Sequence, residues 1–231
     1  MPNSTAVFVI PAFNEEQVIN ETIAPIIDAG FMVICVDDAS VDNTNKEALK
    51  AGAFVIRHLI NAGQGAALQT GFDFILQSGS LFEDISYVVT FDADGQHSLK
   101  DVESFFEAFD VSPELDVVLG SRFLSLKFKG SGLKKLALKT IAFMSQYTLG
   151  LKLTDRHNGF RVIRKEKLEL FQILSPGYDH ADEFLHIISK NGLRFIEVPT
   201  DICYTDYSVA KGQPLINGFK ILFDRLINGW R

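Results

Sequence analysis

Short runs of apolar residues alternate along the first half of the chain with longer segments whose apolar positions recur every three or four residues. The apolar runs have the length and composition of buried strands, and they span residues 6–10, 31–36, 53–56, 87–91 and 116–119. The segments between them have the spacing of helices that pack one face against a sheet. This alternation predicts an α/β fold with a mainly parallel central sheet that helices flank on both faces.

Polar residues at two junctions indicate where helices begin. Asn14 follows the first predicted strand and is a favourable N-cap residue, and Gly30 ends the same segment. Ser98 and the residues up to Asp101 have the order of a capping box ahead of the helix after the central strand. We therefore expect helices to start at Asn14 and at Ser98.

Charged residues directly follow three of the predicted strands. Asp37 and Asp38 follow the second strand, Asp92 and Asp94 follow the central strand at 87–91, and Arg122 follows the last. Ligands of parallel α/β sheets bind beyond the carboxyl ends of the strands. We therefore expect these side chains to line one cleft.

The pair Asp92 and Asp94 carries the most specific chemistry. One residue separates the two acids, and an extended backbone would point both carboxylates to the same side. Oxygen ligands suit Mg²⁺ or Mn²⁺, which keep positions for water and for a substrate phosphate. The pair therefore predicts a metal-bound nucleotide diphosphate, with two solvated loop acids as the alternative.

Composition narrows the class of protein. The 231 residues include 22 basic and 29 acidic ones, and the net charge of −7 argues against general nucleic-acid binding. Cys35 and Cys203 form neither a disulfide framework nor a zinc motif. The N-terminus has no signal-peptide layout, and no apolar run reaches the ~20 residues that span a bilayer. We expect a cytoplasmic protein, with a peripheral position at the inner face of the cell membrane as the alternative.

The C-terminal residues 214–231 predict an amphipathic helix with a narrow polar stripe and apolar residues over the remaining surface. Such a helix buries its apolar side in a membrane interface, in a homodimer or against the main domain. We expect residues 1–213 to form a single domain, with a donor-binding half at about 1–122 and an acceptor-side half at about 123–213.

Several short motifs together resemble those of family 2 glycosyltransferases, which have the GT-A fold. They lie at residues 11–16, 36–40, 61–63, 92–97, 120–122, 153–155, 159–161, 197–199 and 207–212, in the family's order. Within the family, the chain is most similar to the dolichyl- and polyprenyl-phosphate sugar synthases, without their C-terminal membrane helices. The resemblance implies metal-dependent, inverting transfer of a sugar from a UDP- or GDP-linked donor. It implies an acceptor that is a polyprenyl phosphate or a cell-surface glycan precursor.

The resemblance also implies roles for individual residues at the donor. The positions that match the family's base and ribose contacts are Pro11, Phe13, Glu15, Asp37 and Asp38. The metal and diphosphate site matches Asp92, Ala93, Asp94 and Gln96, while Arg122 and Lys211 match cations near the phosphates. Packing is the alternative for Pro11 and Phe13, and a solvated loop is the alternative for Lys211. Thr205 stands where related synthases have an arginine, which weakens the expected donor contacts of that loop.

The acceptor side offers Asp155 and Glu183 as general bases. A hydroxyl acceptor needs a base within hydrogen-bond reach, whereas a lipid phosphate is already anionic and needs positioning instead. The alternative for Asp155 is an ion pair with Arg156 or Arg161. His97 could face the acceptor or simply complete its turn.

Two other functions fit parts of the pattern. Residues 91–95 also resemble the Asp-x-Asp-Gly start of haloacid-dehalogenase phosphatases, in which Asp92 would be the nucleophile. Gln96 stands where that motif has threonine, and the motif normally follows the first strand. A non-catalytic module that binds nucleotide-sugars is the second alternative.

Overall fold

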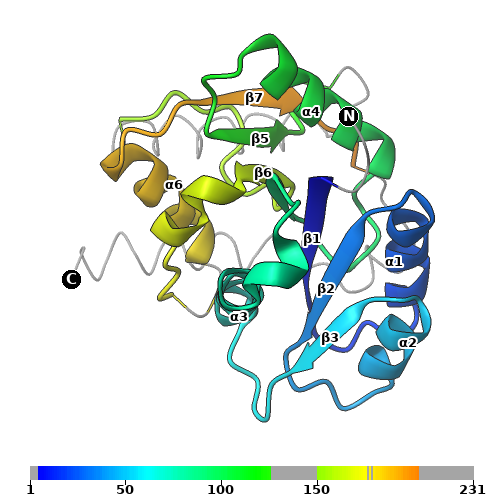
Figure 1. The fold of residues 1–231 in the computed structure, drawn as a ribbon. Coiled ribbons are helices and arrows are strands. Elements are labelled where there is room, and N and C mark those ends of the chain that lie inside the picture. Colours follow the sequence, from blue (N-terminus) through cyan, green and yellow to red (C-terminus); the bar gives the residue numbers. More distant parts are fainter. Residues whose placement is uncertain (1–4, 126–149, 176, 178, 203–231) are drawn as a thin grey trace, which may run out of the picture.

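The computed structural model describes residues 5–125, 150–175, 177 and 179–202, and these residues build a sheet covered by helices (Figure 1). The sheet has seven strands in the order β3-β2-β1-β4-β6-β5-β7. The strands are β1 Ala6–Ala12, β2 Met32–Asp37, β3 Phe54–Arg57, β4 Tyr87–Thr90, β5 Val117–Ser121, β6 Arg161–Arg164 and β7 Phe195–Pro199. The α-helices are α1 Ile19–Asp28, α2 Thr44–Lys50, α3 Gln64–Gln77, α4 Val102–Val111 and α6 His180–Lys190. Short 3₁₀ helices are η2 Gly79–Phe82, η3 Leu99–Asp101 and η4 Lys165–Leu170.

The sheet is parallel except at β6. This strand pairs antiparallel with β4, where Thr90 lies opposite Arg161, and antiparallel with β5, where Leu119 also lies opposite Arg161. The carboxyl ends of the six other strands therefore meet the amino end of β6 at one edge. The predicted α/β fold with a mainly parallel sheet is confirmed.

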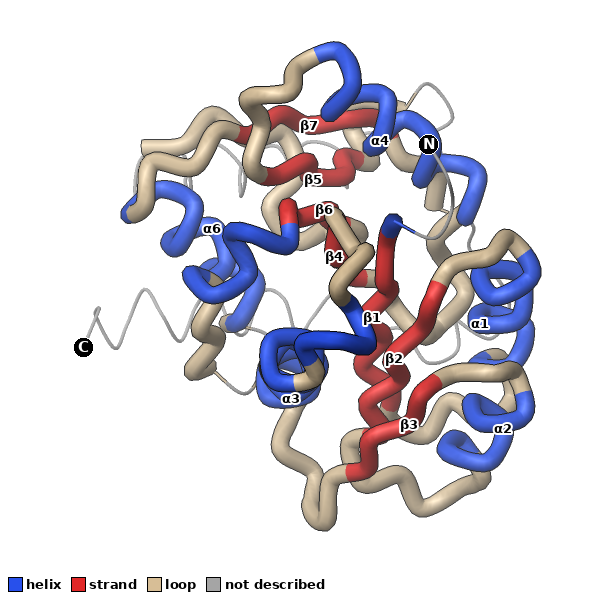
Figure 2. The backbone as a smooth tube through the Cα atoms, viewed as in Figure 1, coloured by secondary structure: helices blue, strands red, loops and turns tan. Residues whose placement is uncertain are grey.

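Side chains alternate between two hydrophobic layers along each buried strand. In β1, Phe8 and Ile10 join the layer under α1 and α4, while Val7 and Val9 join the layer under α3 and α6. Figure 2 shows the red strands between these two sets of helices. Helices on both faces explain why the strands are continuous apolar runs.

Of the two predicted helix starts, the one at Asn14 is wrong. Helix α1 begins at Ile19, and Asn14 has a left-handed φ of 55°. The Asn14 side chain accepts a hydrogen bond from the Val41 amide at 2.9 Å, so it joins two loops instead of capping a helix. The helical segment predicted at Ser98 does start there, because Ser98 is the N-cap residue of the 3₁₀ helix η3, which leads directly into α4, but the Ser98 side chain makes no capping hydrogen bond.

Strands β6 and β7 are not among the strands predicted from the sequence. Both come from the part of the chain after residue 122, and β6 lies between β4 and β5. The two predicted halves therefore share one sheet. The predicted helix at 214–231, Lys211, Thr205 and Cys203 lie outside the described residues. Within the described part of the chain, no helix has the length and apolar character needed to cross a membrane.

Candidate active site

The carboxyl edge of the sheet brings the predicted charged residues together along a line of neighbouring strands. Asp37 ends β2, Asp92 follows β4 by two residues, and Arg122 directly follows β5. Pro11 lies near the end of β1, and Arg161 begins β6 between Asp92 and Arg122. The site expected from the sequence is thus centred on β4, with the acids of β2 on one side and Arg122 on the other.

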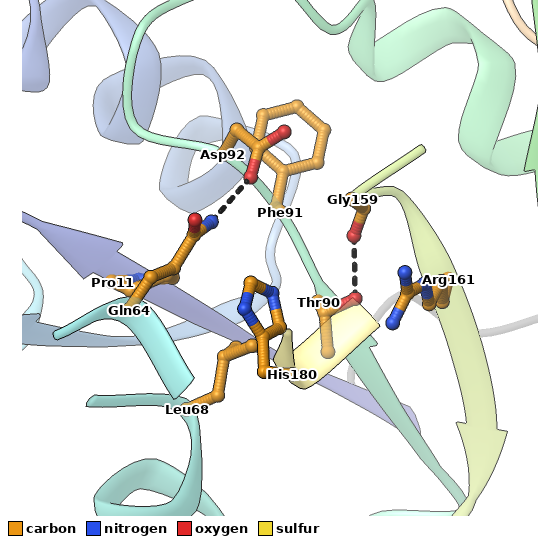
Figure 3. Close-up of a pocket in the computed structure, with 9 residues that line it drawn as sticks. All are labelled: Pro11, Gln64, Leu68, Thr90, Phe91, Asp92, Gly159, Arg161 and His180. Carbon is orange, nitrogen blue, oxygen red and sulfur yellow. Dashed lines mark hydrogen bonds between the residues drawn. The ribbon is translucent and has the colours of Figure 1, made fainter. Parts of the chain in front are cut away.

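The Asp92 carboxylate is held by two side chains. Gln64 Nε2 donates to Asp92 Oδ1 at 3.1 Å, and His97 Nε2 lies 2.9 Å from Oδ2 (Figure 3 shows the first of these bonds). A Cβ atom on Gly159 would lie 2.5 Å from both carboxylate oxygens, so only glycine leaves room for Asp92 there. His97 is buried beside the Phe91 and Phe160 rings, and its Nδ1 has no partner among the described residues.

Burial alone would raise the pKa of Asp92, but the hydrogen bond from His97 and the charges of His97 and Arg161 outweigh it and lower the pKa. The pKa of Asp94 is raised instead, by burial and then by repulsion from Asp92, with Glu15 adding to it. The Gln96 amide donates to Asp94 Oδ1 at 3.0 Å. The two acids therefore repel each other, which is the condition that a bound cation relieves.

No group of three or more histidine, cysteine or acidic side chains forms a ready-made metal centre in the described ranges. Asp92 and Asp94 nevertheless provide carboxylate oxygens, and Gln96 carries an amide oxygen two residues further along the chain, while neighbouring acids raise the pKa of Asp94. This set fits Mg²⁺ or Mn²⁺, which is usually bound by one or two carboxylates together with water and substrate phosphates. Ala93 lies between the acids, and its buried carbonyl accepts a hydrogen bond from Thr22 Oγ1 at 3.1 Å.

Asp38 holds the loop that leads into α3. Its Oδ1 accepts from the Ala62 amide at 2.8 Å and lies 2.7 Å from His58 Nδ1. Its Oδ2 accepts from the Gly63 amide at 2.7 Å. Asp38 is almost fully buried, so its carboxylate orders this loop from inside the fold.

Asp37 is buried as well. Its Oδ1 accepts from the Ser40 amide at 2.9 Å, and its Oδ2 lies 3.2 Å from Arg57 Nε without hydrogen-bond geometry. Of the other predicted donor contacts, Glu15 is buried and Phe13 is 42% exposed. Asp37 and Asp38 therefore organise the loops around the expected nucleotide site, and Phe13 offers an accessible ring.

Arg122 and Asp155 form a bidentate ion pair. Arg122 Nε donates to Asp155 Oδ2 at 2.6 Å and Nη2 donates to Oδ1 at 2.7 Å, and the Arg122 amide adds a third bond. Burial raises the pKa of Asp155, but the bonds and charge of Arg122 lower it below its ordinary value. Glu197 in β7 accepts from the Asp155 amide at 2.9 Å and thereby anchors the loop that carries the pair. The ion-pair alternative for Asp155 thus occurs, but with Arg122 instead of Arg156 or Arg161.

Glu183 lies in the first turn of α6. Its carboxylate accepts from the Ser175 amide at 2.7 Å and from the Leu174 amide at 3.0 and 3.1 Å. Both expected bases, Asp155 and Glu183, are thus engaged by donors of the protein itself.

Three polar residues around Asp92 are not among the predicted site residues. Gln64, Arg161 and His180 are the first residues of α3, β6 and α6, and they converge on a small cavity beside Asp92 (Figure 3). Gly159-Phe160-Arg161 was visible as a motif, but the burial of Arg161 depends on pairing with β4, which is distant in sequence. His180 had no signal of its own.

Comparison with known proteins identifies the family. The family model for glycosyl transferase family 2 matches residues 7–171. A UDP-N-acetylglucosamine–dolichyl-phosphate N-acetylglucosaminyltransferase of Methanococcus voltae is 32% identical, over 98% of this chain and 97% of that protein. The polyprenol monophosphomannose synthase of Mycolicibacterium smegmatis is 27% identical, over 91% of this chain and 82% of that protein.

The fold is also similar to a solved structure. The crystal structure of glucosyl-3-phosphoglycerate synthase from Mycobacterium tuberculosis, in complex with Mn²⁺, UDP and phosphoglyceric acid, superposes with a TM-score of 0.66. The two chains are 18% identical, and the match covers 94% of this chain and 74% of the other. This likeness confirms the GT-A fold. Together with the match to the family model, it leads to one conclusion: the chain belongs to glycosyl transferase family 2 and is a glycosyltransferase.

Proposed function

We propose that this glycosyltransferase moves a sugar, with inversion, from a UDP- or GDP-linked donor to a polyprenyl phosphate, with Mg²⁺ or Mn²⁺ bound at Asp92 and Asp94. The observation that carries the proposal is the pair of mutually repelling carboxylates at the carboxyl end of β4, which raises the pKa of Asp94. Because the chain belongs to glycosyl transferase family 2, we do not retain the phosphatase alternative, and Asp92 is not proposed as a nucleophile.

The ion would be held by oxygen atoms of Asp92, Asp94 and Gln96. Each Asp92 oxygen accepts one protein hydrogen bond and keeps further acceptor capacity. When bound, the ion would supply positive charge to the diphosphate that leaves the sugar.

Arg122 is the protein cation that we propose faces the leaving diphosphate. Its bidentate bond with Asp155 fixes the guanidinium before substrate arrives, so little reorganisation would be needed when negative charge develops. Asp155, expected as a base, serves in this proposal as the positioning residue of Arg122. Lys211 lies outside the described residues, and its contact with the phosphates stays a prediction.

The donor's base and ribose would bind at the loops that follow β1 and β2. Phe13 offers a half-exposed ring for stacking, Glu15 lies on the same loop, and Pro11 lies near the end of β1 just before it. Asp37 and Asp38 would contribute mainly by shaping this pocket, because their carboxylates already bind the loop amides.

The engagement of both expected bases favours an acceptor that needs no deprotonation. Asp155 is paired with Arg122, and Glu183 accepts from the main chain at residues 174 and 175. A phosphate acceptor is already anionic near neutral pH, whereas a glycan hydroxyl requires a base. The printed names of two relatives also include dolichyl phosphate and polyprenol. A lipid acceptor would bring the chain to a membrane surface, where residues 214–231 are the proposed contact if they do not form a homodimer.

Product analysis tests this proposal. The full-length chain is incubated with UDP- and GDP-sugars, Mn²⁺ and a short polyprenyl phosphate, and both the nucleoside diphosphate and the glycolipid are quantified. We expect both products to appear together and only with metal and acceptor present. Transfer to a glycan hydroxyl with no transfer to the lipid phosphate would overturn the acceptor assignment, and donor binding without turnover would favour the non-catalytic module.

A further inference from the structure

A small cavity lies beside Asp92, between the sheet and the N-terminal ends of α3 and α6. Its volume is about 10 Å³, which is room for about one water molecule. Gln64 approaches it from α3, His180 from α6 and Arg161 from β6, while Thr90 and Asp92 complete its polar wall (Figure 3). Neither a sugar nor a phosphate fits in this volume.

Arg161 carries a buried positive charge into this wall. The residue is 3% exposed, its Nε donates to the Asn158 carbonyl at 3.0 Å, and its guanidinium carbon lies 4.3 Å from the centre of the Phe184 ring. Within the described ranges, no residue accepts a hydrogen bond from its two terminal NH₂ groups. These two groups are not among the fully buried polar atoms that lack a partner, so they border space that water can enter, and water can accept from them.

Asp92 is the acid that balances this charge. The two groups make no direct ion pair within the described part of the chain, yet Asp92 is the strongest of the acids that oppose the effect of burial on Arg161. Burial lowers the pKa of Arg161 to about 10, and Asp92, Asp155 and Asp182 act in the opposite direction. The guanidinium therefore remains charged at neutral pH.

We propose that Arg161 is a positioning residue for Asp92, and that a single water molecule in the cavity links the guanidinium to the carboxylate. The cavity has the volume of one water and the polar partners that a buried water requires. Arg161 thus acts through Asp92 and does not touch the donor. What Asp92 is positioned for rests on the proposed function, but the charge coupling itself does not.

The other contacts of Asp92 hold its carboxylate in place and so support the coupling. Gln64 and His97 each bind one oxygen, and the Gly159 backbone closes the space next to both oxygens. Thr90 Oγ1 donates to the Gly159 carbonyl at 2.6 Å, which fixes that backbone and leaves the hydroxyl oxygen able to accept from a water. Arg161 and His180 are therefore the remaining groups that act on the charge of Asp92 from inside the fold, and Arg161 has the larger effect of the two.

A double-mutant cycle on stability tests the inference without any ligand. Asp92→Asn, Arg161→Met and the double variant are unfolded in urea beside the wild-type protein. Asp92→Asn leaves Arg161 as an uncompensated buried cation, so we expect a lower urea midpoint in that variant. Removing Arg161 as well takes away the unbalanced charge, so we expect the double variant at or above the midpoint of the weaker single variant.

Arg164 provides the matched control. It lies at the other end of β6, where its side chain donates to the carbonyls of Leu115 and Pro113. Arg164→Met should therefore add to Asp92→Asn without coupling. Additive effects of Arg161→Met and Asp92→Asn, like those of the control, would overturn the inference.

A replacement variant and a ligand titration complete the test. If Arg161→Met does not accumulate as folded protein, Arg161→Gln replaces it, because the glutamine amide can still donate to the Asn158 carbonyl. The same variants are titrated with Mn²⁺ and UDP or GDP, whichever the wild-type protein binds, and we expect Arg161→Met to weaken binding in the wild-type background but not in the Asp92→Asn background. Absence of Mn²⁺-dependent binding of both UDP and GDP by the wild-type protein would contradict the proposed function, whereas the urea cycle judges the Arg161–Asp92 coupling independently.

Discussion

Asp155 accepts two hydrogen bonds from the guanidinium of Arg122, at 2.6 and 2.7 Å, and a third from the Arg122 main-chain amide. The two residues are far apart in the chain. The sequence predicts that Arg122 acts on the donor phosphates and that Asp155 acts on the acceptor. Their pairing joins the loop that carries Asp155 to the end of β5. The orientation of Arg122 therefore depends on Asp155, and the effect of removing either residue should resemble the effect of removing the other.

Asp155→Asn should lower turnover strongly and destabilise the fold by about 3 kcal/mol, because one partner of a buried ion pair is left uncompensated. Urea unfolding and steady-state kinetics measure the two effects. Asp182→Asn is the control for stability, because it breaks another ion pair, with Arg156, and leaves the pair of Asp155 with Arg122 in place. If Asp155→Asn lost activity while Arg122→Gln retained it, the positioning role of Asp155 would be refuted.

The contribution of Asp155 to stability should depend on pH. Its pKa is lowered from 3.8 in the folded state, so the stabilisation is fully present above pH 3.8 and is lost as the pH falls through the lower folded value. The difference in unfolding free energy between wild type and Asp155→Asn should therefore be constant near neutrality and shrink in acid. A difference that grows below pH 3.8 would contradict this sign.

Gly159→Ala should displace Asp92, because the added Cβ would lie 2.5 Å from both of its oxygens. We expect the Mn²⁺-dependent affinity for UDP to fall tenfold or more, which corresponds to about 1.4 kcal/mol. Calorimetric titration measures the affinity. Gly79→Ala is the control, because no atom lies within 4 Å of its added Cβ. Equal affinities of the two variants would show that Asp92 has more room than its contacts indicate.

Asp38→Asn should release the loop at residues 58–63. Ala62 and Gly63 donate to different oxygens of Asp38, and asparagine replaces one of these oxygens by an NH₂ group, so one part-buried donor loses its partner at a cost of about 1–3 kcal/mol. Amide hydrogen exchange measures the effect directly, and we expect protection to fall at Ala62 and Gly63. Asp73→Asn, which touches only the Gln69 side-chain bond of α3, should leave that protection unchanged.

The sequence predicted those features of the fold that depend on local pattern. Continuous apolar runs identified β1, β2 and β4, and the acids after β2 and β4 indicated the edge where the site lies. Strand β6 escaped detection because it has four residues, begins and ends with arginine, and gains its apolar surroundings only by lying between β4 and β5. The start of α1 was misjudged because Asn14 bonds to a loop distant in sequence, a partner that capping rules do not consider.

For the candidate site too, the sequence predicted only what depends on local pattern. Asp92, Asp94 and Arg122 could be placed from strand ends alone. The pairing of Arg122 with Asp155 and the burial of Arg161 could not, because both arise from contacts between segments far apart in the chain. Local spacing identifies groups of similar chemistry, but the charges that neutralise them are set by tertiary packing.

The central claim is that Asp92 and Asp94 bind a divalent ion that holds the donor's diphosphate. Its most direct test compares the thermal shifts caused by UDP- and GDP-sugars, with and without Mn²⁺, in the wild type, in Asp94→Asn and in the surface variant Asp84→Asn. We predict a nucleotide shift that requires Mn²⁺ in the wild type and in Asp84→Asn and that disappears in Asp94→Asn. A full Mn²⁺-dependent shift in Asp94→Asn would contradict the claim.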